Sequence, residues 1–373
     1  MNNPKTKRRR KIQFGLRSLL ALMLVAGVGT GWFVSRIREV QSQDKIAEKL
    51  SLEVGVQLNA IPKKRSIVEM LVGRKLYPDS YFIRAPIDRM EIVTSEASKL
   101  KHVWELEVDL DFPGKQKDLS FATNFPDLQT LTVTNCQKLE SIEGIEALQN
   151  LKRLDIFFEY RSNIGFSMKP LRSLQNLEMF AVGGAGDMRD IEVLGQLPHL
   201  ESLTLATSNP WSFQLSNRDE LRELYIHSAT TFEDVDFIGS MHSLRKLTIE
   251  GNYLGSVPKS DVLKNLDELN IIDCESLVGN SASAKNVTVT GGTMQNLQGV
   301  VAFNGASSIE FREVLFRDIS GLGKLKNVSQ IYLSNCLLKR MPLRSANPKI
   351  KELQQSLPNT TIIVGPRTHK NSP

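Results

Sequence analysis

The 373-residue sequence has little cysteine and none of the common catalytic motifs. The zinc-protease motif H-E-x-x-H, the phosphate-binding motif G-x-x-x-x-G-K-[ST] and the nucleophile elbow G-x-S-x-G are all missing. None of the three cysteines belongs to a C-x-x-C pair or has a companion histidine, and the five histidines lack metal-ligand spacing. We therefore predict that the protein is not an enzyme and binds no metal or cofactor.

Most of the chain has no excess of positive charge, although the whole sequence has a formal net charge of +6. Residues 1–38 hold nine Lys or Arg and no Asp or Glu. Of the 47 basic and 41 acidic residues in the whole chain, 38 basic and 41 acidic residues therefore remain in residues 39–373, a net charge of −3. Such a body lacks the positive surface that binding to phosphate backbones requires, so we predict no nucleic-acid partner.

Long apolar runs are also missing, except for LLALMLVAGVGTGWFV at Leu19–Val34, directly after the basic segment. As a helix, residues 18–35 would be about 27 Å long, just under the ~30 Å hydrocarbon core of a bilayer. The positive-inside rule places the basic end in the cytoplasm, with Trp32 and Phe33 at the far interface. We therefore predict a cytoplasmic basic segment at 1–17 and a transmembrane signal-anchor helix at 18–35.

A cleaved secretory signal is the alternative interpretation of this segment. Such signals also have a basic start, a Leu-rich centre and small residues, here Ala26, Gly27, Gly29 and Gly31. The uncleaved anchor is favoured because the apolar run continues to Val34 without a clear A-x-A cleavage site. Both interpretations place residues 36–373 outside the cytoplasm.

One residue spacing recurs through the rest of the chain. The segment LQTLTVTNC has the spacing L-x-x-L-x-L-x-x-N/C from Leu128 to Cys136. Seven copies in register have their apolar positions at Leu128, Leu131, Val133; Leu151, Leu154, Ile156; Leu174, Leu177, Met179; Leu200, Leu203, Leu205; Leu221, Leu224, Ile226; Leu244, Leu247, Ile249; and Leu266, Leu269, Ile271. Weaker copies lie at Val103, Leu106, Val108; Ala284, Val287, Val289; Ala306, Ile309, Phe311; and Val328, Ile331, Leu333.

This spacing predicts an α/β solenoid. Each repeat supplies one short strand and a convex segment that returns the chain, and stacking of the repeats buries the leucine rows in one core beside a concave parallel β-sheet. Convex segments such as 141–151 and 318–328 place apolar residues three or four apart, which predicts short helical turns.

Solenoid ends need caps, because they otherwise expose the core. We predict a juxtamembrane stalk and helical N-terminal cap at 36–100, the repeat domain at 101–365 and a disordered tail at 366–373. Within 350–364, an amphipathic helix on Ile350, Leu353 and Leu357, followed by a strand, is expected to close the stack.

The three cysteines share one repeat position, three residues after the last apolar strand residue. They are Cys136, Cys274 and Cys336. Positions that are repeats apart in a stack cannot approach within the ~7 Å Cα separation of a disulfide. We therefore predict buried free thiols.

These frames resemble the leucine-rich-repeat superfamily, particularly internalin-like bacterial surface proteins with short repeats. The resemblance covers residues 101–365, and RRRKIQFGLRSLLALMLVAGVGTGWF is similar to the leaders of bacterial membrane-anchored repeat proteins. It implies a horseshoe that binds proteins or glycans on its concave face, outside a bacterial cytoplasmic (inner) membrane. The irregular stretches at 157–171 and 206–221 depart from the family pattern and leave the curvature open.

Residues that alternate with the strand leucines project from the concave face and are candidates for ligand binding. Six of them form the candidate site: Asp155, Phe157, Glu178, Phe180, Tyr225 and His227. Exposed aromatics ringed by polar groups are typical of binding hot spots. The alternative is that Phe157 and Phe180 only cover the loops that follow them.

A polar face extends the candidate site on both sides, through Glu107, Thr132, Thr134, Thr248, Glu250, Asn270, Thr288, Thr290, Glu310 and Tyr332. The sequence therefore predicts a non-catalytic, membrane-anchored binding or scaffold protein with a protein or polysaccharide ligand. The alternatives are a structural cell-envelope protein that assembles laterally and an enzyme of unfamiliar type.

Overall fold

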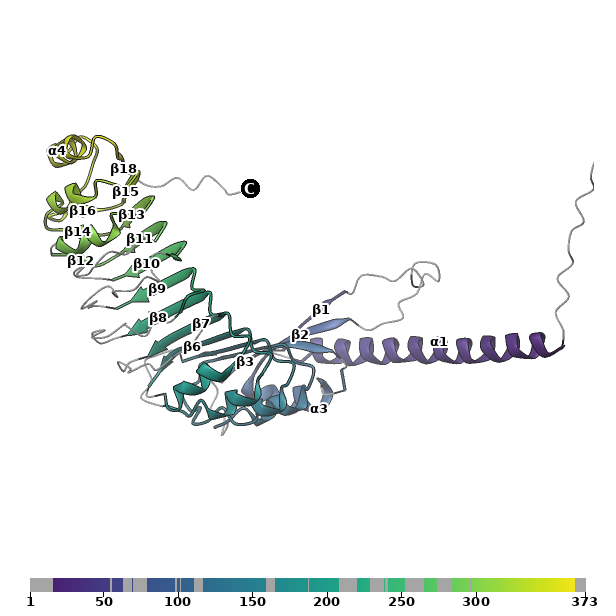
Figure 1. The fold of residues 1–373 in the computed structure, drawn as a ribbon. Helices are drawn as coiled ribbons and strands as arrows, with labels where there is room; N and C mark the ends of the chain where they lie inside the picture. Colours follow the sequence, from purple (N-terminus) through teal and green to yellow (C-terminus); the bar gives the residue numbers. More distant parts are fainter. Residues whose placement is uncertain are drawn as a thin grey trace, which may run out of the picture.

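The structure is a computed structural model that describes residues 16–53, 56–62, 69, 79–97, 99–100, 102–110, 117–158, 165–186, 188–207, 220–228, 238, 241–251, 265–273, 284–295 and 297–365. The strands stack side by side along a curved body, and one long helix projects from its N-terminal end (Figure 1). The predicted tail at 366–373 and the first 15 residues lie outside the described part of the chain.

Most of the described strands form one long sheet in chain order, which is the arrangement expected of a solenoid. Its fourteen members are β1 (Gln57–Ile61), β2 (Ser80–Pro86), β3 (Val103–Asp109), β4 (Thr130–Thr134), β5 (Arg153–Phe157), β6 (Met179–Ala185), β7 (Ser202–Thr207), β8 (Glu223–Ser228), β9 (Lys246–Glu250), β10 (Glu268–Ile272), β11 (Asn286–Thr290), β13 (Ser308–Arg312), β15 (Gln330–Ser334) and β18 (Thr361–Val364). All neighbours pair in parallel except β1 and β2, which are antiparallel. The sheet confirms the predicted leucine-rich-repeat solenoid.

The buried rows explain why the sequence folds this way. Leu131 pairs with Leu154 and Val133 with Ile156, and all four side chains are fully buried. Alternation along a strand turns the residues between them to the opposite, concave face. The leucine spacing therefore determines both the core and the surface available to a ligand.

The repeat on β6 departs from the predicted frame. Phe180 pairs with Leu154 and Val182 with Ile156, so the buried positions are Leu177, Phe180 and Val182. The predicted frame at Leu174, Leu177 and Met179 is therefore wrong by three residues.

The convex side is built from 3-10 helices, which confirms the predicted helical turns at 141–151 and 318–328. These helices are η2 (Ser120–Asn124), η3 (Ile145–Ala147), η4 (Lys169–Ser173), η5 (Ile191–Gln196), η8 (Gln298–Phe303) and η9 (Ser320–Lys324). The turn before η3 needs a glycine: Gly144 has a φ of +100°, and a Cβ there would lie 2.6 Å from the Ser120 backbone.

A small second sheet follows the C-terminal repeats beside the main one. It contains β12 (Thr293–Met294), β14 (Leu315–Phe316), β16 (Leu337–Leu338) and β17 (Met341–Pro342). Phe316 on β14 packs edge-to-face against Phe311 on β13, with the ring centroids 5.3 Å apart. This contact joins the two sheets through the core.

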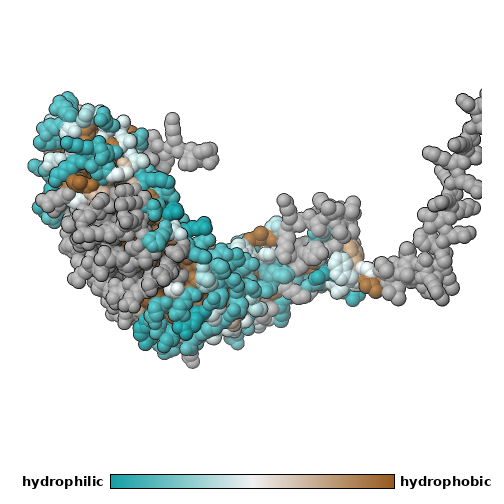
Figure 2. Space-filling model, viewed as in Figure 1, coloured by the Kyte–Doolittle hydropathy of each residue, from teal (hydrophilic) through white to brown (hydrophobic). Residues whose placement is uncertain are grey.

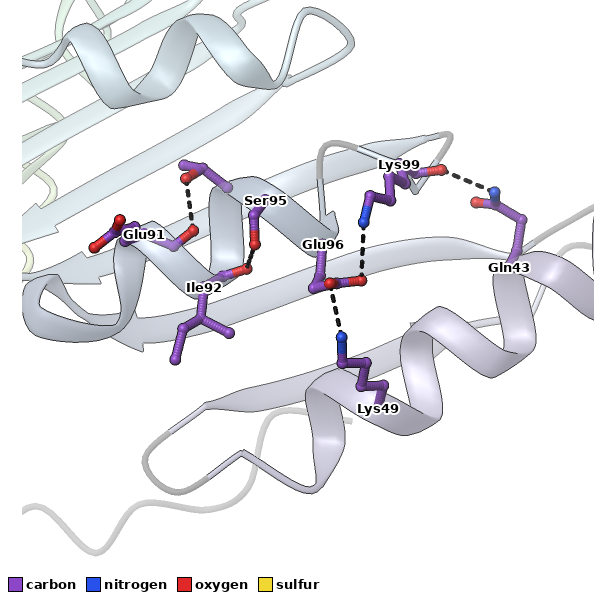
Figure 3. A network of polar contacts seen from close by, with 8 residues as sticks. Gln43, Lys49, Glu91, Ile92, Ser95, Glu96 and Lys99 are labelled. Atoms are coloured by element: carbon purple, nitrogen blue, oxygen red, sulfur yellow. Dashed lines mark hydrogen bonds and ion pairs between the residues drawn. The ribbon is translucent and has the colours of Figure 1, made fainter.

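The N-terminal cap combines helices with the antiparallel β1–β2 pair. Helix α1 (Leu16–Ser51) packs its last turns against α3 (Met90–Ala97), which follows the 3-10 turn η1 (Ile87–Arg89). Figure 3 shows the polar contacts between them: Gln43 Nε2 donates to the Lys99 carbonyl (2.9 Å), and Glu96 accepts from Lys49 at 2.7 Å and pairs with Lys99 at 3.2 Å. Most of residues 63–78, part of the predicted cap, lies outside the described residues.

The C-terminal cap agrees with the predicted amphipathic helix. Helix α4 (Pro348–Ser356) is capped by Asn347, whose side chain accepts a hydrogen bond from the Lys349 amide. Ile350, Leu353 and Leu357 are buried against the last repeat, and β18 follows as the final strand.

The predicted anchor segment, residues 18–35, forms part of α1. Within the described part of the chain, no helix combines the length and the hydrophobicity that crossing a bilayer requires.

Two of the three cysteines are described, and both are buried free thiols as predicted. The Cys136 thiol donates to the Val133 carbonyl (3.5 Å), and Cys336 lies 3.2 Å from the Phe311 carbonyl. Burial raises the pKa of Cys136 to about 12 and that of Cys336 to about 11. Cys274 lies outside the described residues.

Candidate functional site

The candidate site lies on the concave face, where side chains form rows across the strands. We define the central row as the residues between the two buried positions of each strand. From β4 to β15 these are Thr132, Asp155, Ala181, Thr204, Tyr225, Thr248, Asn270, Thr288, Glu310 and Tyr332. The outer row lies two residues further along each strand: Thr134, Phe157, Gly183, Ala206, His227, Glu250, Ile272, Thr290, Arg312 and Ser334.

A groove of about 830 Å³ crosses this face from β5 to β13. It begins at Phe157 and ends at Arg312, and both rows contribute to its walls and floor. Because its lining residues lie on paired strands, the hydrogen-bonded sheet fixes their relative positions. The shape of the groove is therefore set by the sheet itself.

Phe157 forms the wall at the N-terminal end of the groove. Its side chain is 39% exposed, and its ring leans over the next strand, where a Cβ on Gly183 would meet Phe157 Cδ1 at 3.0 Å. Small residues follow on the floor, with Gly183 on β6 and Ala206 on β7. Because Gly183 has no side chain, the Phe157 ring can lie over β6, and space remains beside the ring.

Tyr225, His227 and Glu250 form a polar cluster in the middle of the groove region. The Tyr225 hydroxyl donates a hydrogen bond to Glu250 Oε2, and His227 Nδ1 lies 3.4 Å from Glu250 Oε1. Burial, together with the hydrogen bond to Glu250 and the charge of Glu250, raises the pKa of Tyr225. At neutral pH the hydroxyl therefore keeps its proton and acts as a hydrogen-bond donor.

Asp155 lies on the concave face of β5 but is only 4% exposed. Its Oδ2 pairs with Arg153 Nε at 2.6 Å and accepts from Thr132 Oγ1 at 3.4 Å. A buried carboxylate needs such partners, because desolvation otherwise makes the charge unfavourable. Asp155 holds Arg153 and Thr132 in place and offers little surface to a ligand.

Two predicted site residues lie elsewhere. Phe180 is 1% exposed, because the β6 register places it in the core in line with Leu154, so its predicted position on the concave face is wrong. Glu178 precedes β6 at the rim of the sheet, where it pairs with Lys152 at 2.6 Å. The structure therefore brings Phe157, Tyr225 and His227 to one face, with Asp155 beneath it.

The structure adds residues that the sequence did not single out. Gly183 lies within β6, which continues to Ala185 with a register shift between Gly183 and Ala185 that marks a bulge. Arg312 at the far end contacts Glu310 at 3.3 Å, and Ser334 Oγ donates to Glu310 at 3.0 Å. Correct strand pairing would have identified each of these positions.

The described residues contain no group of three or more His, Cys, Asp or Glu side chains that could hold a metal ion. The arrangement instead suits hydrogen bonding and apolar contact. Hydroxyls, an amide and small side chains line the floor, and Phe157 supplies an exposed ring.

Comparisons with known proteins gave similarities to solved structures. No protein-family model matches the sequence, and no curated protein matches it at a significant level. An internalin (inlF) from Listeria monocytogenes str. 4b F2365 is 17% identical, covers 75% of this chain and 88% of its own, and has a TM-score of 0.39. Internalin C2 (inlC2) from the same strain is 13% identical, covers 74% of this chain and 91% of its own, and has a TM-score of 0.31.

The functional domain of InlJ from Listeria monocytogenes, which includes a cysteine ladder, is also similar. It is 14% identical and has a TM-score of 0.34, with 65% of this chain and 62% of that chain covered. The strand register of this chain establishes the solenoid independently of these similarities.

Proposed function

We propose that the protein is a non-catalytic binding protein that recognises a protein or a glycan through its concave face. The preformed groove between β5 and β13 carries this proposal. An exposed aromatic ring beside small floor residues gives a ligand a place to bury apolar surface, and polar groups along the floor fix its orientation.

The chemistry of the central cluster supports binding rather than catalysis. The raised pKa of Tyr225 keeps its hydroxyl protonated at neutral pH, so it is a poor nucleophile or base there. Glu250 already accepts the Tyr225 hydrogen bond and faces His227. The cluster is therefore a hydrogen-bonded part of the binding surface.

We further propose that residues 18–35 anchor the protein in a membrane, with the repeats on the outer side. This proposal is supported by the basic segment before the apolar run. Helix α1 projects from the body (Figure 1), and hydrophobic residues, drawn brown, lie on this projection (Figure 2). The α1 side chains of Val28, Trp32 and Val34 are exposed. Since α1 continues unbroken into the cap, where Leu50 is buried, such an anchor would hold the repeats in a fixed orientation.

A pull-down from envelope extract tests the binding function. The full chain in detergent is compared with the double variant Phe157→Ala, Tyr225→Ala and with a matched control, Val301→Ala, an exposed apolar residue on η8 of the convex side. We expect a component that the native chain and the control retain and the double variant loses. Equal retention by all three proteins would contradict the proposed site, and self-association without any partner would favour the envelope-assembly alternative.

A further inference from the structure

The central row of the groove is uncharged over five consecutive strands, although Glu223 and Lys246 also line the groove. In the central row, β7 to β11 present Thr204, Tyr225, Thr248, Asn270 and Thr288. Hydroxyl and amide side chains can each donate and accept hydrogen bonds, and none of them carries a charge at neutral pH. A ligand along this row therefore meets paired donor and acceptor groups rather than an electrostatic field.

The internal hydrogen bonds of this row leave bonding capacity for a ligand. Asn270 Nδ2 donates to Thr248 Oγ1 at 3.2 Å. Thr248 is only 7% exposed, so the capacity lies with its neighbours: Asn270 Oδ1 can still accept, and the partly exposed Thr288 hydroxyl can donate and accept. Because neighbouring strands lie roughly 4.8 Å apart, such groups recur at a regular interval across the sheet.

Several charged side chains at the groove already have partners within the protein. Arg312 contacts Glu310 at 3.3 Å. Lys246 on β9 pairs in register with Glu223 on β8, and its Nζ lies 3.8 Å from Glu268 on β10. Glu250 accepts from Tyr225 and faces His227. A strongly charged ligand would have to compete with these contacts, whereas a neutral one would not.

Resting on the proposed binding function, we infer that the groove binds a neutral, hydroxyl-rich glycan chain that runs across the strands from Phe157 toward Arg312. Sugar hydroxyls match the dual donor and acceptor groups of the central row, and the C–H face of a sugar ring packs on an aromatic face such as Phe157. A protein ligand is less well matched, because protein hot spots are clusters of aromatic and Arg anchors that a partner can contact. Here Tyr225 is hydrogen-bonded to Glu250, and Arg312 is paired with Glu310. Among the described groove residues, only Phe157 is a large apolar side chain with high exposure.

The inference is tested on an array that holds neutral, acidic and amino-sugar oligosaccharides together with extended peptides. The full chain in detergent is compared with Thr288→Val and Asn270→Leu, which keep similar shapes but remove the hydrogen-bonding groups. Thr134→Val on β4, outside the groove, is the matched control. Phe157→Ala is included because any ligand of the proposed site should contact this ring, and the unfolding of all variants is measured first.

We expect binding to neutral oligosaccharides, unchanged in Thr134→Val. Thr288→Val or Asn270→Leu should each weaken it about tenfold, or about 1.4 kcal/mol, because each removes hydrogen bonds to the ligand. Binding only to peptides or charged glycans, if Phe157→Ala still weakens it, would overturn the inference of a neutral glycan and leave the proposed binding function unaffected. Array binding that all variants share would overturn the inference and also contradict the concave site. No binding to any array member would count against the glycan alone, since the pull-down tests the site separately.

Discussion

Phe157 and Phe180 are identical side chains on neighbouring strands, yet they belong to different regions of the molecule. Phe157 lies at the end of β5 on the concave face and is 39% exposed, whereas Phe180 lies in the core between Leu154 and Leu203 and is 1% exposed. Side-chain type does not distinguish them, and strand register does. The comparison separates two roles: core residues hold the solenoid together, and concave residues are available to a partner.

The largest expected effect is that of a charge placed in the core. Leu154→Asp should unfold the repeats, because burying an unpaired carboxylate costs several kcal/mol. Thr204→Asp on the concave face is the control and should leave thermal unfolding nearly unchanged. A folded Leu154→Asp variant with an unaltered melting temperature would refute the assignment of the leucine row to the core.

The two phenylalanines give the next effect. Phe180→Ala should lower the free energy of unfolding by about 3–5 kcal/mol, because it leaves a cavity in the core. Phe157→Ala should lower it by only about 1 kcal/mol, because its ring is partly exposed already. Denaturant unfolding of both variants measures the difference, and equal losses would show that the assigned β6 register is wrong.

Alkaline pH distinguishes core from surface through Cys136. Burial raises the pKa of its thiol from 9.0 to about 12, so above pH 9 the unfolded chain loses this proton while the folded chain keeps it. The contribution of Cys136 to stability is present below pH 9 and decreases as the pH rises toward 12, by at most about 1.4 kcal/mol for each pH unit. The free energy of unfolding is measured between pH 7 and 11 for the native protein and for Cys136→Ala. The difference between the two proteins should decrease as the pH rises. A difference independent of pH would mean that the thiol is not buried.

The smallest expected effect on stability comes from Gly183→Ala. The added Cβ would contact Phe157 Cδ1 at 3.0 Å and force the ring to move, while alanine already occupies the same row at Ala206. We expect a change of a few tenths of a kcal/mol in unfolding, together with weaker partner binding. Unaltered binding would indicate that the position of the Phe157 ring does not matter to the ligand.

The sequence was sufficient to predict most of the repeat frames. Residues such as Leu131, Leu154 and Leu203 recur at a spacing that only stacked strands bury in common, and the amphipathic pattern of Ile350 and Leu353 was enough to place the C-terminal cap. These features depend on local periodicity, which a single sequence displays directly.

Register on β6 could not be predicted in the same way. Leu174, Leu177 and Met179 fit the repeat spacing as well as Leu177, Phe180 and Val182 do. Which of the two frames forms the strand depends on the length of the preceding convex segment. That segment buries Phe166 and Met168 before η4, so the strand begins three residues later than predicted. Because the length of that segment matters only in the folded stack, the sequence pattern placed Phe180 on the concave face.

The strand pairing in the N-terminal cap also could not be predicted from the sequence pattern. The strand QLNAI at β1 is short and mostly exposed, and it pairs in antiparallel with β2, although every repeat strand pairs in parallel. A strand stabilised by its edge contact rather than by a leucine row leaves no periodic pattern to detect.

The most direct test of the concave binding site fills the groove without touching the core. Ala206→Trp places a large side chain on the floor beside Phe157, and Val301→Trp places the same side chain on the convex surface. If the groove is the binding site, Ala206→Trp should abolish binding of the partner retained in the pull-down while unfolding stays close to native, and Val301→Trp should bind normally. Full binding by a folded Ala206→Trp variant would contradict the assignment of the groove as the binding site.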